Sequence, residues 1–166
     1  MLVWVPAAYP IAQLQLATTP RDLSWPAGLA IVSLGLLAIF VNYSADAQRQ
    51  RVRATAGAAL VWGKPPRLIE ATYETADGAV RTNLLLVSGY WSLARHFHYL
   101  PEIAVALAST LPVGASAGVA YVYVFFLATL LLDRVGRDDR RCQVKYGAAW
   151  AEYRRLVPFK VVPGLF

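Results

Sequence analysis

The residues best suited to chemistry gather in one stretch of twelve, Ser88–Tyr99. It contains Arg95, both histidines of the chain (His96 and His98) and four aromatic side chains. The longest uncharged run of the sequence, residues 103–132, follows almost directly. Hydrogen-bond donors and ring faces at this density therefore predict a polar ligand site at a membrane surface. A belt of interfacial aromatic residues would have a similar composition, and this alternative stays open.

A basic segment precedes this stretch. Arg49, Arg51 and Arg53 alternate with uncharged residues just after an apolar run. On a helix, Arg49 and Arg53 lie four residues apart and share one face. The segment fits the positive charge found on the cytoplasmic side of membrane helices, and it also fits an anion site.

A second basic segment lies near the C-terminus. Its pattern predicts an amphipathic helix over about residues 139–156, capped by Asp138 or Asp139. Such a helix either lies on anionic lipid or faces a cleft that takes a phosphate-bearing cofactor with an aromatic ring. Its apolar and aromatic face comprises Cys142, Tyr146, Ala149, Tyr153 and Leu156, and its basic flanks comprise Arg141, Lys145, Arg154 and Arg155.

Several chemistries lack their sequence signals. Cys142 is the only cysteine, so an internal disulfide and a cysteine-built metal site are excluded. His96 and His98 have no acidic partner at the spacing of zinc proteases, and no metal is predicted. The sequence contains no glycine-rich Rossmann turn, P-loop or nucleophile elbow. Basic and aromatic side chains would therefore have to hold any dinucleotide.

The composition indicates a membrane protein. Hydrophobic residues make up 57% of the chain and charged residues 16%, whereas soluble domains carry about a quarter charged residues. The net charge is +6. A nucleic-acid-binding protein would share the basic character but not the long apolar runs, so no nucleic-acid partner is expected.

We expect a single membrane domain over residues 1–166, all-helical and multi-pass, with a small cytosolic β-hairpin. A spanning helix is predicted at about residues 24–45 and an amphipathic helix at about 139–156. Between them a broken helical hairpin is predicted at about residues 101–134, because thirty uncharged residues are interrupted by Pro112 and small residues.

The predicted β-hairpin consists of strands at residues 67–75 and 81–87, joined by the two-residue turn signal Asp77-Gly78. Residues 45–100 carry seven Lys and Arg and residues 134–166 carry eight, whereas residues 1–44 carry one. A helical hairpin between the two basic segments places both on one side, which the positive-inside rule makes cytoplasmic.

Residues 84–102 closely resemble the signature of the sterol reductases, the ergosterol-biosynthesis type that acts on C-14, C-24 or Δ7 double bonds. The Δ7-reductases are the most similar members. The resemblance runs collinearly from about residue 1 to the end. Further matches lie at residues 42–43, 48–50, 60–64, 75–78, 131–134, 137–142, 145–147, 150, 153 and 163–166.

The resemblance implies a multi-pass enzyme of the endoplasmic reticulum membrane that acts in sterol biosynthesis. It implies that NADPH is used to reduce a sterol ring double bond, of the 7-dehydrocholesterol to cholesterol type. Its partners would be a sterol substrate and the lipid bilayer. Family members are far longer, so this chain is expected to be the C-terminal, cofactor-binding part without the N-terminal transmembrane helices. A second chain could supply those helices.

The resemblance also implies site residues. Arg49 and Arg53 become partners for the 2′-phosphate and pyrophosphate, whereas no contact carries over to Arg95 or His96. The catalytic residue stays open, with His96 and Tyr99 as candidates for delivering the proton. Ala47 and Ala54 replace residues that other members vary between basic and polar, so weaker cofactor binding is expected. The implied cofactor contacts are Arg49, Arg53, Leu86, Trp91, His98, Tyr99, Asp138, Cys142, Lys145, Tyr146 and Tyr153.

Two other interpretations stay open. The chain could be a catalytically incomplete cofactor-binding fragment or a sterol-binding scaffold without turnover. It also shares an Arg-His-x-x-Tyr element and a terminal aromatic helix with isoprenylcysteine carboxyl methyltransferases, which use S-adenosylmethionine. Those enzymes normally carry proline where Phe97 stands here, so the sequence favours the reductase.

Overall fold

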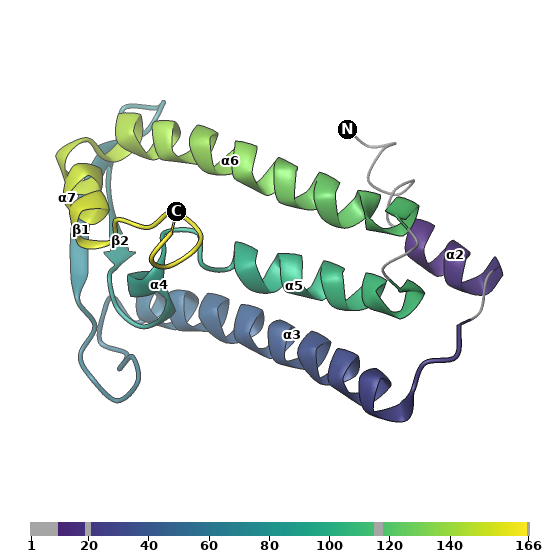
Figure 1. Ribbon diagram of the computed structural model, residues 1–166. Coiled ribbons are helices and arrows are strands. Elements are labelled where there is room, and N and C mark those ends of the chain that lie inside the picture. The colour runs from purple at the N-terminus through teal and green to yellow at the C-terminus, as the bar shows by residue number, and fades with distance from the viewer. Residues whose placement is uncertain (1–9, 19–20, 115–117, 166) are drawn as a thin grey trace. The chain divides into compact units, whose positions relative to one another are not determined.

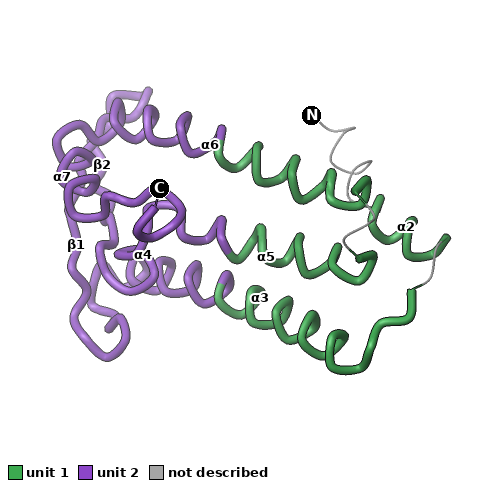
Figure 2. The backbone as a smooth tube through the Cα atoms, in the orientation of Figure 1, with its two compact units in different colours: residues 1–41, 101–132 green, residues 42–100, 133–166 purple. Residues whose placement is uncertain are grey.

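The computed structural model describes residues 10–18, 21–114 and 118–165, which are mostly helical with a two-stranded antiparallel sheet (Figure 1). These residues form two compact units (Figure 2). Unit 1 comprises residues 1–41 and 101–132, and unit 2 comprises residues 42–100 and 133–166. The polar and aromatic stretch Ser88–Tyr99 therefore belongs to unit 2.

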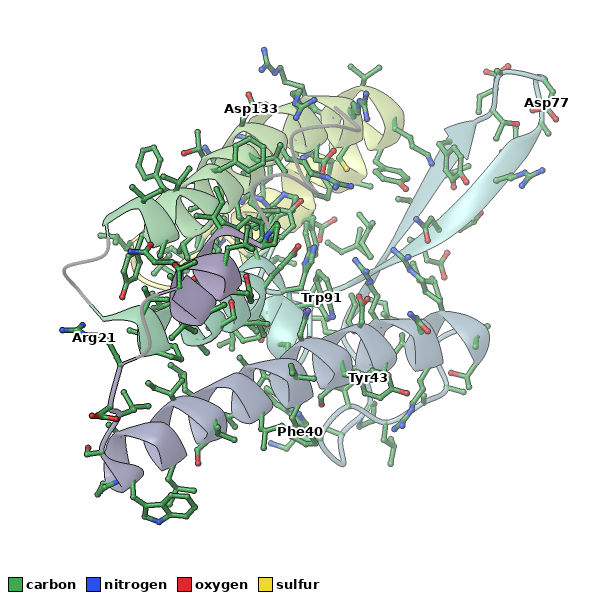
Figure 3. The ribbon with its side chains drawn as sticks, turned by 90° about the vertical axis from the view of Figure 1, so that its right-hand side faces the viewer. Arg21, Phe40, Tyr43, Asp77, Trp91 and Asp133 are labelled. Carbon is green, nitrogen blue, oxygen red and sulfur yellow. The ribbon has the colours of Figure 1, made fainter. Side chains whose placement is uncertain are left out.

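Two helical stretches are long and apolar enough to cross a membrane. One is α3, Trp25–Ala54, and the other runs from Gly118 to Tyr146 through the 3₁₀ turn η2 (Gly118–Tyr121) and helix α6 (Val122–Tyr146). On α3, the large side chains of Phe40 and Tyr43 are exposed (Figure 3). A long helix that is apolar and exposed along most of its length is typical of a lipid-facing segment.

Helix α3 begins close to the predicted boundary but extends further. The prediction ended it near residue 45, whereas the structure continues it to Ala54. Residues 46–54 contain no glycine or proline, so nothing in them breaks the helix. The extension places Arg49 and Arg53 on one face of its last turns.

The predicted break in the second apolar region is confirmed. Helix α5, Tyr99–Thr110, passes into the 3₁₀ turn η1, Leu111–Val113, which contains Pro112. Gly114 follows with a φ of 83°. The predicted hairpin ends near residue 134, whereas in the structure its second arm continues to Tyr146 as part of α6.

The predicted single helix over residues 139–156 is wrong, because two helices cover this region. Residues 134–146 belong to α6, and a separate helix, α7, covers Ala148–Leu156. Neither Asp138 nor Asp139 caps a helix, because both lie inside α6, where Arg134 donates to Asp138 at 3.3 Å. The break falls instead at Gly147, whose φ of 51° favours glycine.

Unit 1 has a small core around helix α2, Ile11–Thr18. Ala12 of α2 packs against Val113 and Ala120. Gly35 of α3 faces Ala108 of α5, and a Cβ at position 35 would lie 3.5 Å from the Ala108 Cβ. Small residues at this position let the two helices approach closely.

Unit 2 contains the predicted β-hairpin, formed by β1 (Leu68–Glu74) and β2 (Val80–Leu86). The register runs from Leu68 opposite Leu86 to Glu74 opposite Val80. The connection is longer than the predicted two-residue turn. The Thr75 amide donates to the Ala79 carbonyl at 2.9 Å, so three residues turn the chain at the tip marked by Asp77 (Figure 3).

Helix α7 covers one face of this hairpin (Figure 1). Alternate strand residues point to that face, as the two-residue period of a strand requires. The contact buries an apolar core that fixes α7 against the sheet. Its buried members are Ile69, Ala71, Leu85, Val87, Trp150, Tyr153 and Val157.

A glycine turn opens the stretch Ser88–Tyr99 and leads into the short helix α4, Tyr90–Leu93. Gly89 has a φ of 64°. The Tyr90 amide donates to Gln48 Oε1 of α3 at 3.1 Å. A Cβ at Gly89 would overlap the Gln48 side chain. The turn therefore requires glycine for its backbone conformation, and a side chain there would also displace Gln48 and break its hydrogen bond to the Tyr90 amide.

We expect Gly89→Ala to lower the free energy of unfolding by about 2 kcal/mol, because displacing Gln48 removes its hydrogen bond to the Tyr90 amide in addition to the cost of a positive φ. Gly63→Ala is the matched control. Gly63 has a φ of 75°, and a Cβ added there would have no heavy atom within 4 Å, so this variant carries the backbone cost alone, about 1 kcal/mol. Urea unfolding in detergent measures the free energy of unfolding of both variants. An equal loss of stability in the two variants would contradict the close approach of Gly89 to Gln48.

Candidate functional site

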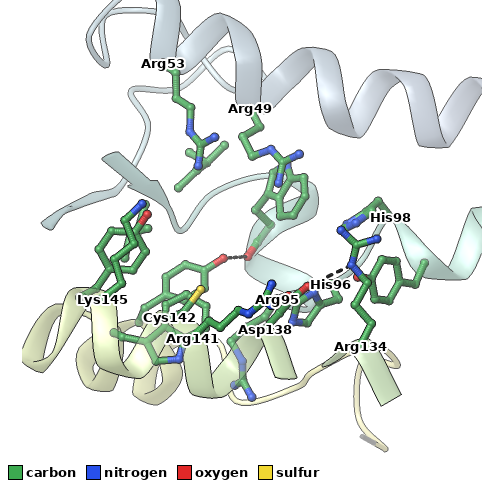
Figure 4. Close-up of a pocket in the computed structure, with 17 residues that line it drawn as sticks. Arg49, Arg53, Arg95, His96, His98, Arg134, Asp138, Arg141, Cys142 and Lys145 are labelled. Atoms are coloured by element: carbon green, nitrogen blue, oxygen red, sulfur yellow. Dashed lines mark hydrogen bonds and ion pairs between the residues drawn. The ribbon is translucent and has the colours of Figure 1, made fainter. Parts of the chain in front are cut away.

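A cleft of about 460 Å³ in unit 2 brings together every residue that the family resemblance assigns to a cofactor (Figure 4). Small-molecule sites typically measure about 300–1,000 Å³. Its walls come from α3, β2, the stretch Ser88–Tyr99, α6 and α7. The assigned residues in its lining are Arg49, Arg53, Leu86, Trp91, His98, Tyr99, Asp138, Cys142, Lys145, Tyr146 and Tyr153, and the proton-donor candidate His96 lines it too. Their roles toward a cofactor stay predictions.

Five further lining residues are not among the cofactor contacts that the resemblance implies: Leu85, Arg95, Arg134, Arg141 and Trp150. Arg134 precedes Asp138 by four residues on the same face of α6, and it was missed because the helix was expected to start near residue 139. Trp150 lies four residues after Tyr146 and three before Tyr153. The helical spacing that selected the two tyrosines would also have selected it.

Trp91 forms the centre of one wall and is only 3% exposed. Its indole Nε1 donates to the Ala45 carbonyl of α3 at 2.9 Å. The guanidinium of Arg49 lies over its ring, 4.1 Å from the centroid. Tyr153 of α7 donates its hydroxyl to the Trp91 carbonyl at 3.4 Å. Trp91 therefore joins α3, α4 and α7 at the cleft.

The cleft is strongly cationic. Six of its lining side chains are Arg or Lys and one, Asp138, is acidic. Some of the cations have partners, such as Arg49, which pairs with Asp46 at 2.6 Å. Among the described residues, the side chains of Arg53 and Arg141 make no hydrogen bond or ion pair. Their charges are therefore available to a ligand.

Both histidines are neutral at physiological pH. Burial lowers the pKa of His96 and of His98 to about 4, and the nearby Arg49 adds to this effect at His98. His96 stacks on Tyr99 with ring centroids 5.2 Å apart, and His98 meets the same ring edge-on at 4.4 Å. His96 Nε2 and His98 Nδ1 are buried without a hydrogen-bond partner in the described structure. Neutral imidazoles of this kind can each offer one donor or acceptor to a polar ligand.

Tyr153 presents a neutral hydroxyl, since burial raises its pKa to about 12. Its ring stacks on Trp150 with centroids 5.1 Å apart. Tyr146 accepts a hydrogen bond from Asn83 of β2 at 2.8 Å, which fixes its ring beside the hairpin. The cleft thus combines fixed aromatic faces with unpaired cations.

The residues present fit a dinucleotide with several phosphate groups. Guanidinium groups without partners suit phosphates, aromatic faces suit the flat rings, and buried imidazole nitrogens without partners suit amide or hydroxyl groups. No Rossmann turn is needed for such an arrangement, because side chains rather than a glycine-rich backbone would contact the phosphates.

Comparison with known proteins identifies the chain's relatives. The model of the ergosterol biosynthesis ERG4/ERG24 family matches residues 1–166. The chain is 46% identical over 165 residues to the 7-dehydrocholesterol reductase of Arabidopsis thaliana and 35% identical over 164 residues to that of Danio rerio. It is 34% identical over 165 residues to the Delta(14)-sterol reductase of Methylotuvimicrobium alcaliphilum. Each alignment covers 99% of this chain but only 38%, 34% and 36% of the respective relative.

The low pKa of the two histidines predicts a pH dependence of stability. Between pH values of about 4 and 6.5 the unfolded chain binds protons at these positions that the folded protein does not bind. The free energy of unfolding should therefore fall as the pH drops from 7.5 to 5.5, by roughly 1 kcal/mol for each histidine. Urea unfolding at several pH values measures the slope. In the His96→Gln, His98→Gln double variant this part of the slope should disappear, and an unchanged slope would contradict the prediction.

Proposed function

This chain belongs to the ergosterol biosynthesis ERG4/ERG24 family, and on that premise we propose that it binds NADPH and takes part in reducing a sterol ring double bond. The relatives include both 7-dehydrocholesterol and Delta(14)-sterol reductases. The identity to a 7-dehydrocholesterol reductase is the higher of the two, which favours the Δ7 bond as the substrate bond. The family match also favours a reductase over the methyltransferase alternative.

The observation that carries the proposal is the convergence of all eleven resemblance-assigned residues on one cationic cleft. NADPH carries a pyrophosphate and a 2′-phosphate, and Arg53 and Arg141 have guanidinium groups free to pair with phosphates. Arg49 is held between Asp46 and the Trp91 ring. A held guanidinium is pre-organised for a bidentate phosphate contact.

A reduced nicotinamide, when bound, supplies the hydride. The chain's own residues would hold the dinucleotide and deliver the proton. The fixed rings of Trp91 and Tyr153 form apolar parts of the lining against which a planar group could pack. Of the two proton-donor candidates, Tyr99 is favoured, because a pKa of about 4 leaves His96 without an extra proton at neutral pH.

The proposal places the chain in the endoplasmic reticulum membrane as a multi-pass protein with its basic segments cytoplasmic. Two helices long and apolar enough to span support this, and α3 exposes much of its apolar surface. The substrate would reach the cleft from the bilayer, since a sterol is concentrated there. A second chain supplying the further transmembrane helices of the longer relatives belongs to this proposal.

A catalytically incomplete cofactor-binding part is a second candidate, because the chain spans only 34–38% of the length of these relatives. The deciding experiment titrates detergent-purified protein with NADPH and with S-adenosylmethionine, then assays reduction of 7-dehydrocholesterol. NADPH binding with turnover supports the reductase, and NADPH binding without turnover, restored by adding the N-terminal helices of a relative, supports the cofactor-binding part. Binding of S-adenosylmethionine but not NADPH would reject both.

Arg53→Ala should weaken NADPH binding at least about tenfold, since it removes a charge-assisted hydrogen bond to phosphate. NADH lacks the 2′-phosphate and should lose no more than about twofold. Isothermal titration with both nucleotides measures the difference. Arg51→Ala is the matched control, because Arg51 lies on the same turns of α3 but does not line the cleft. An equal loss of affinity for NADPH and NADH in Arg53→Ala would reject the contact between Arg53 and the 2′-phosphate.

Cys142 offers a test that does not depend on turnover. It is the single cysteine of the sequence and lines the cleft, half-buried. NADPH at ten times its Kd should slow alkylation of Cys142 by maleimide about tenfold, because only a tenth of the sites stay free. Mass spectrometry measures the rate.

The control for this labelling experiment is Val144→Cys in a Cys142→Ser background. Val144 is 89% exposed on α6 and does not line the cleft, so NADPH should leave its labelling rate unchanged. Equal protection at both positions would indicate a general change of α6 and would count against the cleft as the binding site.

A further inference from the structure

Arg95 stands out because its charge is buried and the family resemblance assigns it no contact. The residue is 6% exposed, and its side chain only 3%. Burial lowers the pKa of its guanidinium, although Asp139 counteracts this. Removing a charge from water is costly unless acceptors compensate it. The acceptors that Arg95 uses therefore show what it does.

Those acceptors are found among four consecutive carbonyl groups of the segment that follows α7, residues 157–160. The Arg95 guanidinium Nη1 donates to the Val157 carbonyl at 2.8 Å and to the Pro158 carbonyl at 3.0 Å. The backbone amide of Arg95 donates to the Phe159 carbonyl at 3.0 Å, and that of His96 donates to the Lys160 carbonyl at 2.7 Å. Two adjacent residues thus hold the whole segment through its backbone.

Asp139 of α6 connects this contact to two helices. Its Oδ1 lies 3.6 Å from Arg95 Nε and accepts a hydrogen bond from the Trp150 indole of α7 at 3.1 Å. Its Oδ2 lies 3.9 Å from Nε of Arg154, also on α7. We call Arg95, Asp139 and the four carbonyls the clamp.

Arg95 and Asp139 each have a sequence neighbour that lines the cleft. His96 follows Arg95 in the chain, and Asp138 precedes Asp139. Trp150, which Asp139 holds directly, forms another part of the lining. The clamp therefore sets the spacing between three walls: the stretch Ser88–Tyr99, α6 and α7.

We propose that Arg95 and Asp139 are positioning residues of the cofactor cleft, acting through the backbone of residues 157–160 and through Trp150. The proposal rests on the proposed binding of NADPH. A purely stabilising role explains the arrangement less well, because a buried ion pair can often be replaced by apolar residues without loss of stability. The hydrogen bonds of the clamp, in contrast, hold the three walls of the cleft in one geometry.

A direct contact of Arg95 with phosphate is the competing explanation, since its side chain also borders the cleft. The two explanations predict opposite changes in NADPH affinity for the Asp139→Asn variant. Removing a negative charge near a site for a polyanion should tighten NADPH binding if charge alone matters. If the clamp positions the walls, the same substitution should weaken binding. Asparagine keeps an oxygen for the Trp150 indole, so the fold is retained.

The experiment measures NADPH Kd and the urea midpoint of the full chain in detergent for Asp139→Asn, Arg95→Lys and Arg95→Met. The clamp predicts about a tenfold weaker Kd in each variant, equivalent to losing one charge-assisted hydrogen bond. It also predicts non-additive losses when Arg95→Met and Asp139→Asn are combined. Arg95→Lys is the second variant should Arg95→Met fail to fold, because it keeps the charge but not the fork of donors.

Asp133→Asn is the matched control for charge. Asp133 pairs with Arg137 on the exposed side of α6 at 2.9 Å and does not line the cleft. Its removal should leave the Kd within about twofold. NADPH binding to Asp139→Asn that is as tight as in the unmodified protein, or tighter, would overturn the proposal.

The rate of Cys142 alkylation in the absence of nucleotide tests the clamp independently of NADPH binding. Cys142 lies three residues after Asp139 on α6, so a loosened clamp should speed its labelling several-fold in the folded variants. Faster labelling in a protein that does not bind NADPH would support the clamp and reject the proposed function. Unchanged labelling in all three variants of a protein that does bind NADPH would reject the clamp alone.

Discussion

The buried indole of Trp91 is the contact on which the cleft depends. Its Nε1 is tied to the Ala45 carbonyl of α3, and its own carbonyl receives the hydroxyl of Tyr153 from α7. An indole buried in this way needs an acceptor for its single donor, and a helix carbonyl near residue 45 supplies it. The helix that carries Arg49 and Arg53 is thereby held beside the helix that carries Tyr153. Without this contact Arg49 and Arg53 would belong to a different surface from Tyr153.

Much of this arrangement could be predicted from the sequence, and the errors lie at the ends of the elements. Patterns of apolar residues located the two long helices, the break at Pro112 and the β-hairpin. They misplaced helix ends, because Asp138 was interpreted as a cap although its pair with Arg134 stabilises the interior of α6. Gly147 is the actual break, and its effect comes from a backbone angle that no hydrophobic pattern encodes.

The site residues were predicted mainly from the family resemblance and less from their spacing in the sequence. Arg53 and Cys142 are far apart in the sequence, so only tertiary structure brings them to one cleft. No contact carried over to Arg95 from the resemblance, and its hydrogen bonds go to backbone carbonyls, which carry no signal in the side-chain sequence. Contacts to main-chain atoms are invisible to any argument from residue types.

Main-chain recognition also decides which changes the C-terminal segment can tolerate. Residues 158–160 are held by their carbonyl oxygens, so a wide range of side chains, including the proline at position 158, leaves these bonds in place. Val157 is the exception, since its side chain is fully buried. Insertion or deletion of a single residue is different, because it shifts every carbonyl by one position relative to Arg95 and His96. The segment is therefore permissive toward substitution but strict in its length.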